Sequence, residues 1–359
     1  MSKISIADAK PGQILEHDIF TPKGQLIAKG GATLNGQLIL HMKFYNINSI
    51  DVVDGDMSEE EADDFVKDTL IYRIKHSPEF LEFKKGYDDQ VANITSVLSD
   101  FVQRQVPLSE RELVGETKKL FKENATGITL MNMLLSMREI DDLTYAHSVN
   151  VAITSRVLGG WLGMSDEDLD ALTLAGLLHD VGKCAIPNSI LLKPASLTAE
   201  EYDIMKKHPV LGYDLLYTED IDMRIKLAAL QHHERCDGSG YPYGTKQSQL
   251  EPFSMIVAIA DVYDAMTADR VYRDGICPFD VIAEFQQNSF TLFHPQYIMI
   301  FLSRIADSYV NAGVMLSDGS RGKILMTNSN ALTRPLIQLD SGVFIDLRDR
   351  TDLYIKAII

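Results

Sequence analysis

Long apolar runs are missing from this sequence. No uninterrupted stretch approaches the ~18 apolar residues that a membrane-spanning helix needs, so we expect no membrane span. The first residues, MSKISIADAKPGQ, also lack the apolar centre of a signal peptide. Cysteines are scarce, with three in 359 residues and no C-x-x-C pair. Together these absences predict a protein of a reducing, cytoplasmic compartment.

Positive charge is also in deficit. The chain has 34 Lys and Arg against 51 Asp and Glu, which gives a formal net charge of −17. Binding to long nucleic acids needs a broad basic surface, so we expect no polymeric nucleic acid as a partner. A small phosphorylated ligand remains compatible with this charge, because a few local cations are enough to hold it.

The apolar pattern predicts a mainly α fold with β structure at both ends. We expect a small β-containing N-terminal module at 1–54, a helical connector at 55–138, a helical domain with the candidate chemistry at 139–311, and a β-rich C-terminal extension at 318–359. Neither β-rich end has enough strands for its own core, so we expect the two ends to pair. The N-terminal module is interpreted as a docking or dimerisation unit. As a dimerisation unit it would make the protein a homodimer. A ligand sensor is the alternative.

Ionisable residues gather in the helical region. The doublet His179-Asp180 ends an apolar run, and Lys183 follows three residues after the aspartate. A single histidine beside an apolar helix is usually an ordinary core residue. Here five histidines and two aspartates occupy such positions: His147, His179, His208, His232, His233, Asp180 and Asp261. So many buried ionisable groups would be costly unless they were paired or bound to metal.

The donor set indicates the kind of metal. Seven nitrogen and oxygen ligands with no thiolate exceed what one zinc ion uses. They suit two divalent first-row ions, and we expect iron, with manganese as the alternative. Beside His232 and His233, the residues Gly238, Gly240 and Pro242 predict a specific loop that shapes a site. The alternative interpretation of that loop is an ordinary helix exit.

These motifs, in this order, resemble the HD-GYP family of cyclic-di-GMP phosphodiesterases, within the HD superfamily of metal-dependent phosphohydrolases. The resemblance rests on His179-Asp180 and on Gly240-Tyr241-Pro242, and it covers about residues 139–311. The supporting segments are 144–148, 178–183, 208–209, 232–235, 237–242, 261–267 and 269–273. The resemblance implies an all-helical HD-type catalytic core.

The resemblance also implies a role for each motif residue. One metal ion would be held by His147, His179, Asp180 and Asp261, and the second by His208, His232 and His233, with Asp180 bridging both. Substrate phosphates would be contacted by Lys183, Arg270 and Arg273. Tyr241 would lie at the edge of the site, on a loop that the family links to binding of GGDEF-type cyclases. The expected catalytic group is His179, Asp180 and Lys183.

The implied reaction is hydrolysis of cyclic-di-GMP, with pGpG or, after a second cleavage, GMP as the alternative end products. Two metal ions can clamp a phosphodiester and lower the pKa of a bridging water, which yields a hydroxide for in-line attack. Lys183 and the arginines would stabilise phosphoryl charge. Two alternatives are another cyclic-dinucleotide substrate, such as cyclic GMP-AMP, and a non-catalytic scaffold that binds nucleotide or a cyclase.

Two positions depart from the family pattern. Some members use a Glu four residues before the first ligand histidine to hold a third metal, but this position is Leu143 here. We therefore expect two ions. His294 stands where many members have Asp, at a position that is not a ligand. Asp264 lies one helical turn after Asp261, and we expect it to orient a ligand.

Overall fold

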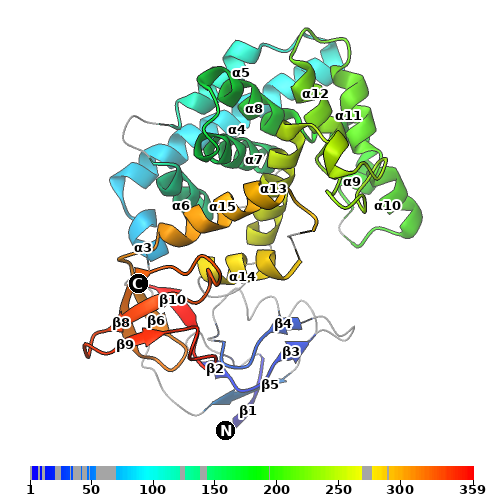
Figure 1. The fold of residues 1–359 in the computed structure, drawn as a ribbon. Helices are drawn as coiled ribbons and strands as arrows, with labels where there is room; N and C mark the ends of the chain where they lie inside the picture. The colour runs from blue at the N-terminus through cyan, green and yellow to red at the C-terminus, as the bar shows by residue number, and fades with distance from the viewer. Residues whose placement is uncertain are drawn as a thin grey trace.

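The structure is a computed structural model of the chain (Figure 1). It describes residues 2–6, 9, 13–20, 26–32, 34, 42, 47, 49–53, 70–121, 126–137, 144–193, 195–268, 277–288 and 291–359. Helices dominate these residues, which confirms the predicted mainly α fold. None of the described helices is long and apolar enough to cross a membrane.

The described helices follow one another along the chain. The predicted connector region contains α3 (Leu70–Lys75), α4 (Pro78–Arg104), α5 (Glu110–Lys118) and α6 (Gly127–Met137). The next helices are α7 (Thr144–Trp161), α8 (Asp166–Leu178), α9 (Asn188–Leu191), α10 (Ala199–Met205), α11 (His208–Leu216), α12 (Met223–Gln231), α13 (Pro252–Ala268), α14 (Pro278–Asn288) and α15 (Pro295–Asp307). Two 3-10 helices, η1 (Val181–Ala185) and η2 (Gln247–Gln249), lie between them.

Several helices begin at side chains that cap free backbone N–H groups. The hydroxyl of Ser77 accepts from the Phe80 N–H at 3.2 Å at the start of α4. At the start of α10, Thr198 and Glu201 form a reciprocal capping box. Such caps stabilise a helix by about 1 kcal/mol each and define where it begins.

One hydrophobic core joins the helices to the C-terminal strands. Phe253 of α13, Phe285 of α14 and Phe301 of α15 are almost fully buried in it. The hydroxyl of Tyr87 on α4 donates to the Ala146 carbonyl of α7 at 3.1 Å, one residue before His147. The connector helices are therefore packed against the helices that hold the candidate site.

The C-terminal strands form a sheet of their own, so the predicted pairing with the N-terminus is wrong. The antiparallel order is β10-β6-β7-β8-β9. The strands are β6 (Gly313–Leu316), β7 (Arg321–Met326), β8 (Leu336–Leu339), β9 (Phe344–Asp346) and β10 (Ile355–Ile358). Val314, Ile324 and Ile337 are buried in the core that the helices share. This sheet packs on the helices and needs no N-terminal strands, and no described strand pairs across the two ends.

The N-terminal strands are separate from this sheet. In one sheet, β5 (Ser49–Val53) lies between β1 (Ser2–Ser5) and β2 (Ile14–Leu15). The strands β3 (Ile19–Phe20) and β4 (Leu26–Ala28) form a second, two-stranded sheet. Their buried residues make a small cluster distinct from the main core. Figure 1 shows both β-rich ends below the helices, on the side of α14.

Candidate metal centre

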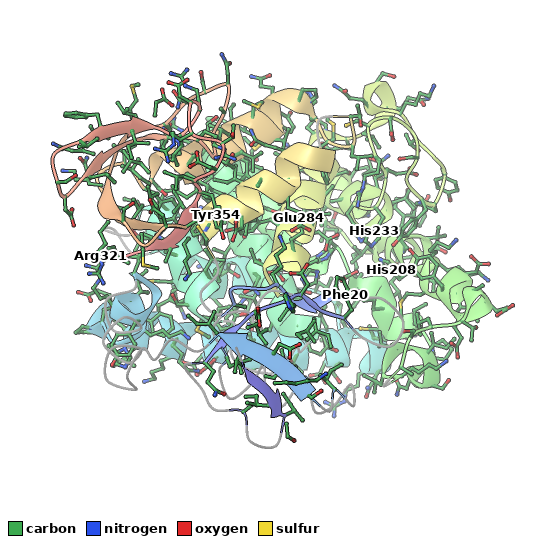
Figure 2. The ribbon with its side chains drawn as sticks, turned by 90° about the horizontal axis from the view of Figure 1, so that it is seen from below. Phe20, His208, His233, Glu284, Arg321 and Tyr354 are labelled. Carbon is green, nitrogen blue, oxygen red and sulfur yellow. The ribbon has the colours of Figure 1, made fainter. Side chains whose placement is uncertain are left out.

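The seven predicted ligands come together from separate helices. His147 lies on α7, His179 and Asp180 follow α8, His208 begins α11, His232 and His233 follow α12, and Asp261 lies on α13. The donor atoms of six of them, all but Asp261, form two groups, each with all atoms within 4.8 Å of one another. One group is Asp180, His208, His232 and His233, and the other is His147, His179 and Asp180. Figure 2 labels His208 and His233, whose ring centroids are 4.9 Å apart.

Gly182 allows two of these segments to meet. A Cβ atom at this position would lie 1.9 Å from the His208 carbonyl oxygen and 2.5 Å from the Gly212 backbone nitrogen. Only glycine permits so close an approach of η1 to α11. The contact brings Asp180, at the start of η1, next to His208.

The Asp180 carboxylate lies between the two groups. Its Oδ1 is 3.2 Å from His208 Nε2 and 3.7 Å from His232 Nε2. Its Oδ2 is 3.4 Å from His179 Nε2 and 3.7 Å from His147 Nε2. Each oxygen therefore faces a different histidine pair, as a carboxylate shared by two cations would.

Backbone carbonyls orient three of the rings. Each Nδ1 lies within hydrogen-bond distance of a carbonyl oxygen: 2.7 Å from His179 to Gly176, 2.8 Å from His208 to Met205, and 3.0 Å from His232 to Ala229. A carbonyl only accepts, so each Nδ1 donates, and a neutral ring then presents a bare lone pair at Nε2. His208 and His232 bring these two Nε2 atoms to 3.2 Å. Two lone pairs at that distance repel each other unless a cation or a proton lies at them.

The unsatisfied atoms also fit a metal. His179 Nε2 and Asp180 Oδ1 are buried and have no hydrogen-bond partner among the described residues. Burial lowers the pKa of His208 to about 4, despite the opposing effect of Asp180, and so keeps the ring neutral. Burial likewise lowers the pKa of His232 and His233. Neutral imidazoles and a carboxylate are the forms that bind divalent ions.

His147 is held by two carboxylates. Its Nδ1 lies 2.7 Å from Asp264 Oδ2, as expected from the position of Asp264, and its Nε2 lies 3.1 Å from Asp261 Oδ1. Burial disfavours the charged ring, but hydrogen bonds to Asp261 and Asp264 outweigh it and raise the pKa to about 10. A cation bound between Nε2 and Asp261 would replace the Nε2 proton, and Asp264 would continue to orient the ring.

The predicted substrate-contact residues are only partly described. Lys183 Nζ lies 2.5 Å from Asp180 Oδ2, so its ammonium is at the candidate metal centre. The Tyr241 ring stacks on the His233 ring at the border of the group, with centroids 4.6 Å apart. Arg270, Arg273 and Leu143 lie outside the described residues.

One residue of the site region was missed in the sequence analysis. The side chain of Glu234 is buried and accepts hydrogen bonds from the backbone of the Tyr241 loop. A carboxylate directly after two ligand histidines and before a glycine-rich loop was a usable signal, because Asp and Glu side chains commonly bind loop N–H groups.

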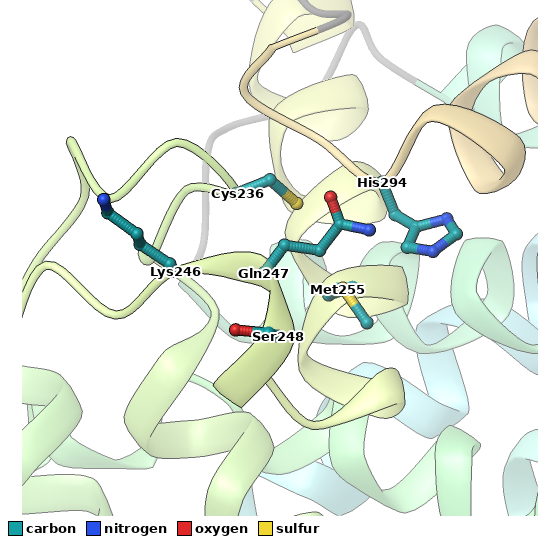
Figure 3. Close-up of a pocket in the computed structure, with 6 residues that line it drawn as sticks. All are labelled: Cys236, Lys246, Gln247, Ser248, Met255 and His294. Carbon is teal, nitrogen blue, oxygen red and sulfur yellow. The ribbon is translucent and has the colours of Figure 1, made fainter.

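A pocket beside the same loop is distinct from the metal centre. Figure 3 shows the residues that line it, which are Cys236, Lys246, Gln247, Ser248, Met255 and His294. None of the seven candidate ligands lines this pocket. His294 lies here, at the start of α15.

Comparison with known proteins identifies the family. The HD domain family profile matches residues 115–296, about half of the chain, and the chain belongs to this family. A Pseudomonas aeruginosa protein named as a cyclic di-GMP phosphodiesterase is 34% identical over 224 residues, which is 61% of this chain and 52% of that protein. A Vibrio cholerae protein named as a 3'3'-cGAMP-specific phosphodiesterase is 37% identical over 214 residues, 54% of this chain and 41% of that protein.

The comparisons confirm the resemblance to HD-GYP proteins. A solved HDG"Y"P protein from Bdellovibrio bacteriovorus has the same fold, with a TM-score of 0.50 and 18% identity over 84% of this chain and 97% of that chain. The chain spans about half the length of the curated relatives it matches. HD domains bind divalent metal, which agrees with the clustered histidines and aspartates.

Proposed function

We propose that the protein is a metal-dependent phosphodiesterase that hydrolyses cyclic-di-GMP to pGpG, with GMP as the alternative end product. The observation that carries this proposal is the position of Asp180, whose two oxygens face two histidine pairs. Most of the donor atoms converge in two groups that share this carboxylate, and their chemistry fits divalent cations. Relatives named as cyclic di-GMP phosphodiesterases support the substrate class.

The proposed ligand sets follow the two groups. The first ion is assigned to His147, His179, Asp180 and Asp261, and the second to His208, His232, His233 and Asp180. Iron is the proposed metal, and manganese is the alternative. When bound, such ions polarise a phosphodiester and lower the pKa of water.

The chain's own residues would bind and orient the substrate. Lys183 reaches the centre as an ammonium and would donate to a phosphoryl oxygen. Arg270 and Arg273 would donate to the other phosphate oxygens. Tyr241 would contact the substrate at the border of the site. Asp264 and the backbone carbonyls hold the histidine rings in place, so that little reorganisation accompanies binding.

A second candidate substrate is 3'3'-cyclic GMP-AMP. It is favoured by the Vibrio cholerae relative whose printed name specifies this nucleotide and which is 37% identical over the aligned residues. Both substrates present two phosphodiesters on a cyclic backbone, so the same metal centre suits either. The bases distinguish them.

Four further assignments accompany this function as proposals. The loop Gly240-Tyr241-Pro242 would bind a GGDEF-type cyclase, and the N-terminal module at 1–54 would dock a partner or a second copy of the chain. The protein would act in the cytoplasm. The remaining divisions are a connector at 55–138, a catalytic domain at 139–311 and an extension at 318–359.

The test is anaerobic purification, metal analysis, and an assay with both nucleotides after reconstitution with Fe(II) or Mn(II). We expect chelator-sensitive hydrolysis of cyclic-di-GMP that is faster than that of 3'3'-cyclic GMP-AMP. The reverse preference would favour the second candidate. Metal-loaded protein that binds nucleotide without turnover would contradict the phosphodiesterase function and favour a scaffold.

A further inference from the structure

The ring of His233 is held by different contacts from those of the other four candidate ligand rings. The Nδ1 atoms of His147, His179, His208 and His232 each lie within hydrogen-bond distance of a carboxylate or carbonyl oxygen. Among the described residues, no hydrogen bond to the His233 ring is found, and its nearest charged neighbour, Asp261 Oδ2, is 3.7 Å from Nδ1. A ligand ring without such a partner needs another means of orientation.

Tyr241 covers the His233 ring. The two rings are stacked, with centroids 4.6 Å apart and planes 27° from parallel. The same tyrosine meets the His208 ring edge-on, with centroids 6.4 Å apart. The Tyr241 N–H also donates to the His233 carbonyl at 3.2 Å. The tyrosine is thus connected to His233 through both its backbone and its ring.

Glu234 holds the loop that carries Tyr241. Its side chain is buried, with 2% of the residue exposed. Oε1 accepts from the Tyr243 N–H at 2.8 Å, and Oε2 accepts from the Thr245 N–H at 2.9 Å. The Thr245 hydroxyl adds a third hydrogen bond at 3.3 Å. One carboxylate, directly after His233 in the chain, therefore fixes the far side of the loop.

Gly240 lets the loop fold back onto the ligand segment. A Cβ atom there would lie 2.5 Å from the His233 carbonyl oxygen and 2.5 Å from the Arg235 backbone nitrogen. The next residue is Tyr241, so this close approach of the backbone determines the position from which the Tyr241 side chain extends.

We propose that Tyr241 is a positioning residue for the ligand His233, and that Glu234 anchors the loop that presents the tyrosine ring. The aromatic face takes the place of the hydrogen bond that orients each of the other rings. This role is additional to substrate contact by Tyr241, and it rests on the metal centre of the proposed function. It predicts that loss of the Tyr241 ring weakens binding of the second metal ion, which His233 would hold with His208 and His232.

The experiment measures metal affinity without substrate. Metal-free protein is titrated anaerobically with Mn(II), and free Mn(II) is followed by its electron paramagnetic resonance signal. Loss of a group that orients a metal ligand typically costs 10- to 100-fold in affinity. We expect Tyr241→Ala to lower the affinity for one of the two ions by about this factor. The affinity for the other ion should stay within about twofold of the wild-type value.

Two control variants separate stacking from other effects. Tyr243→Ala removes a tyrosine of the same loop, a residue that is 67% exposed, and keeps its backbone N–H to Glu234. Tyr241→Phe keeps the ring and removes only the hydroxyl. Both should bind Mn(II) as the wild type does. In Glu234→Gln the side chain can no longer accept hydrogen bonds from both loop N–H groups. This variant should lower the affinity for the same ion as Tyr241→Ala does.

A double-mutant cycle tests whether Glu234 acts through Tyr241. If it does, Glu234→Gln adds no further loss in the Tyr241→Ala background. Full additivity would overturn the anchoring role. Three outcomes would each overturn the positioning role. One is unchanged Mn(II) affinity in Tyr241→Ala, and another is an equal loss of affinity in Tyr243→Ala or in Tyr241→Phe. The third is the absence of Mn(II) binding by the wild type.

Folding and activity are read separately. Far-UV circular dichroism confirms the fold of each variant, and Tyr241→Leu, which is apolar but not planar, replaces Tyr241→Ala if the latter loses its helical signal. A wild type that binds two Mn(II) ions but hydrolyses no cyclic dinucleotide would refute the proposed function and leave the role of Tyr241 standing.

Discussion

Lys183 allows phosphate binding and metal binding to be told apart. Its Nζ lies 2.5 Å from Asp180 Oδ2, the oxygen that also faces His179 and His147. Burial alone would raise the pKa of Asp180, but Lys183 and His179 lower it well below its usual range. The ammonium and a divalent ion would thus share this oxygen. Lys183→Met keeps the apolar stem and removes the charge.

The expected effects on turnover and on metal binding differ. A hydrogen bond to a charged group contributes about 1.5–3 kcal/mol, which corresponds to a fall of roughly 10- to 150-fold in kcat/KM if Lys183 contacts the transition state. Metal affinity should stay equal or rise, because a cation that competes for Asp180 has been removed. The assay is hydrolysis of cyclic-di-GMP at saturating Mn(II), with Mn(II) affinity measured on the same preparations.

The control is Lys193→Met, because Lys193 forms an ion pair with Glu201 at 2.6 Å rather than with a candidate ligand. Lys193→Met should change neither kcat/KM nor Mn(II) affinity. A drop of tenfold or more in Mn(II) affinity in Lys183→Met would refute the reasoning, since it would make the lysine a support of the metal centre. Unchanged kcat/KM would refute the phosphate contact.

Three other predictions follow from the site and its surroundings. Asp180→Ala should lose both ions and all hydrolysis while its far-UV circular dichroism stays helical; near-full activity in this variant would contradict the shared carboxylate. Crystals grown with excess metal should show two anomalous peaks rather than three, because Leu143 cannot bind metal, and a third strong peak near His147 would contradict this. Burial raises the pKa of Glu251 to about 7 from its ordinary 4.5, so the stability contributed by its protonated form should be present below about pH 4.5 and lost as the pH rises through about 7. The thermal midpoint of the wild type relative to Glu251→Gln should therefore be lower at pH 8 than at pH 5, and a difference independent of pH would count against it.

The sequence was sufficient to single out residues that the fold brings together, because their residue types and order are distinctive. His147 and Asp261 lie more than a hundred residues apart, yet each stands beside an apolar helical run, and the fold brings them to 3.1 Å. The role of Asp264 followed from helical spacing. These predictions depended on local pattern and on family resemblance, which a single chain displays directly.

Features decided by tertiary contacts were less accessible. The two β-rich ends were predicted to pair because each seemed too short, but the buried face of Ile324 and Ile337 packs on helices whose position the sequence does not show. Glu234 was missed for the same reason. Its place in the sequence marks the carboxylate as a candidate loop anchor, but its partners, the N–H groups of Tyr243 and Thr245, are identified only by the fold of the loop.

The two separate hydrophobic clusters have a consequence for cooperativity. The C-terminal strands share a core with the helices, so removal of strand β10 would expose apolar surface of that core and should lower the melting temperature of the helical signal. The N-terminal strands have a small cluster of their own, made of residues such as Leu15, Ile27 and Ile50. Segments with few buried apolar contacts open at lower free energy than the rest of a protein. We expect hydrogen exchange in β1 and β5 to be faster than in α7 and α13, so that these strands can open while the metal centre stays intact.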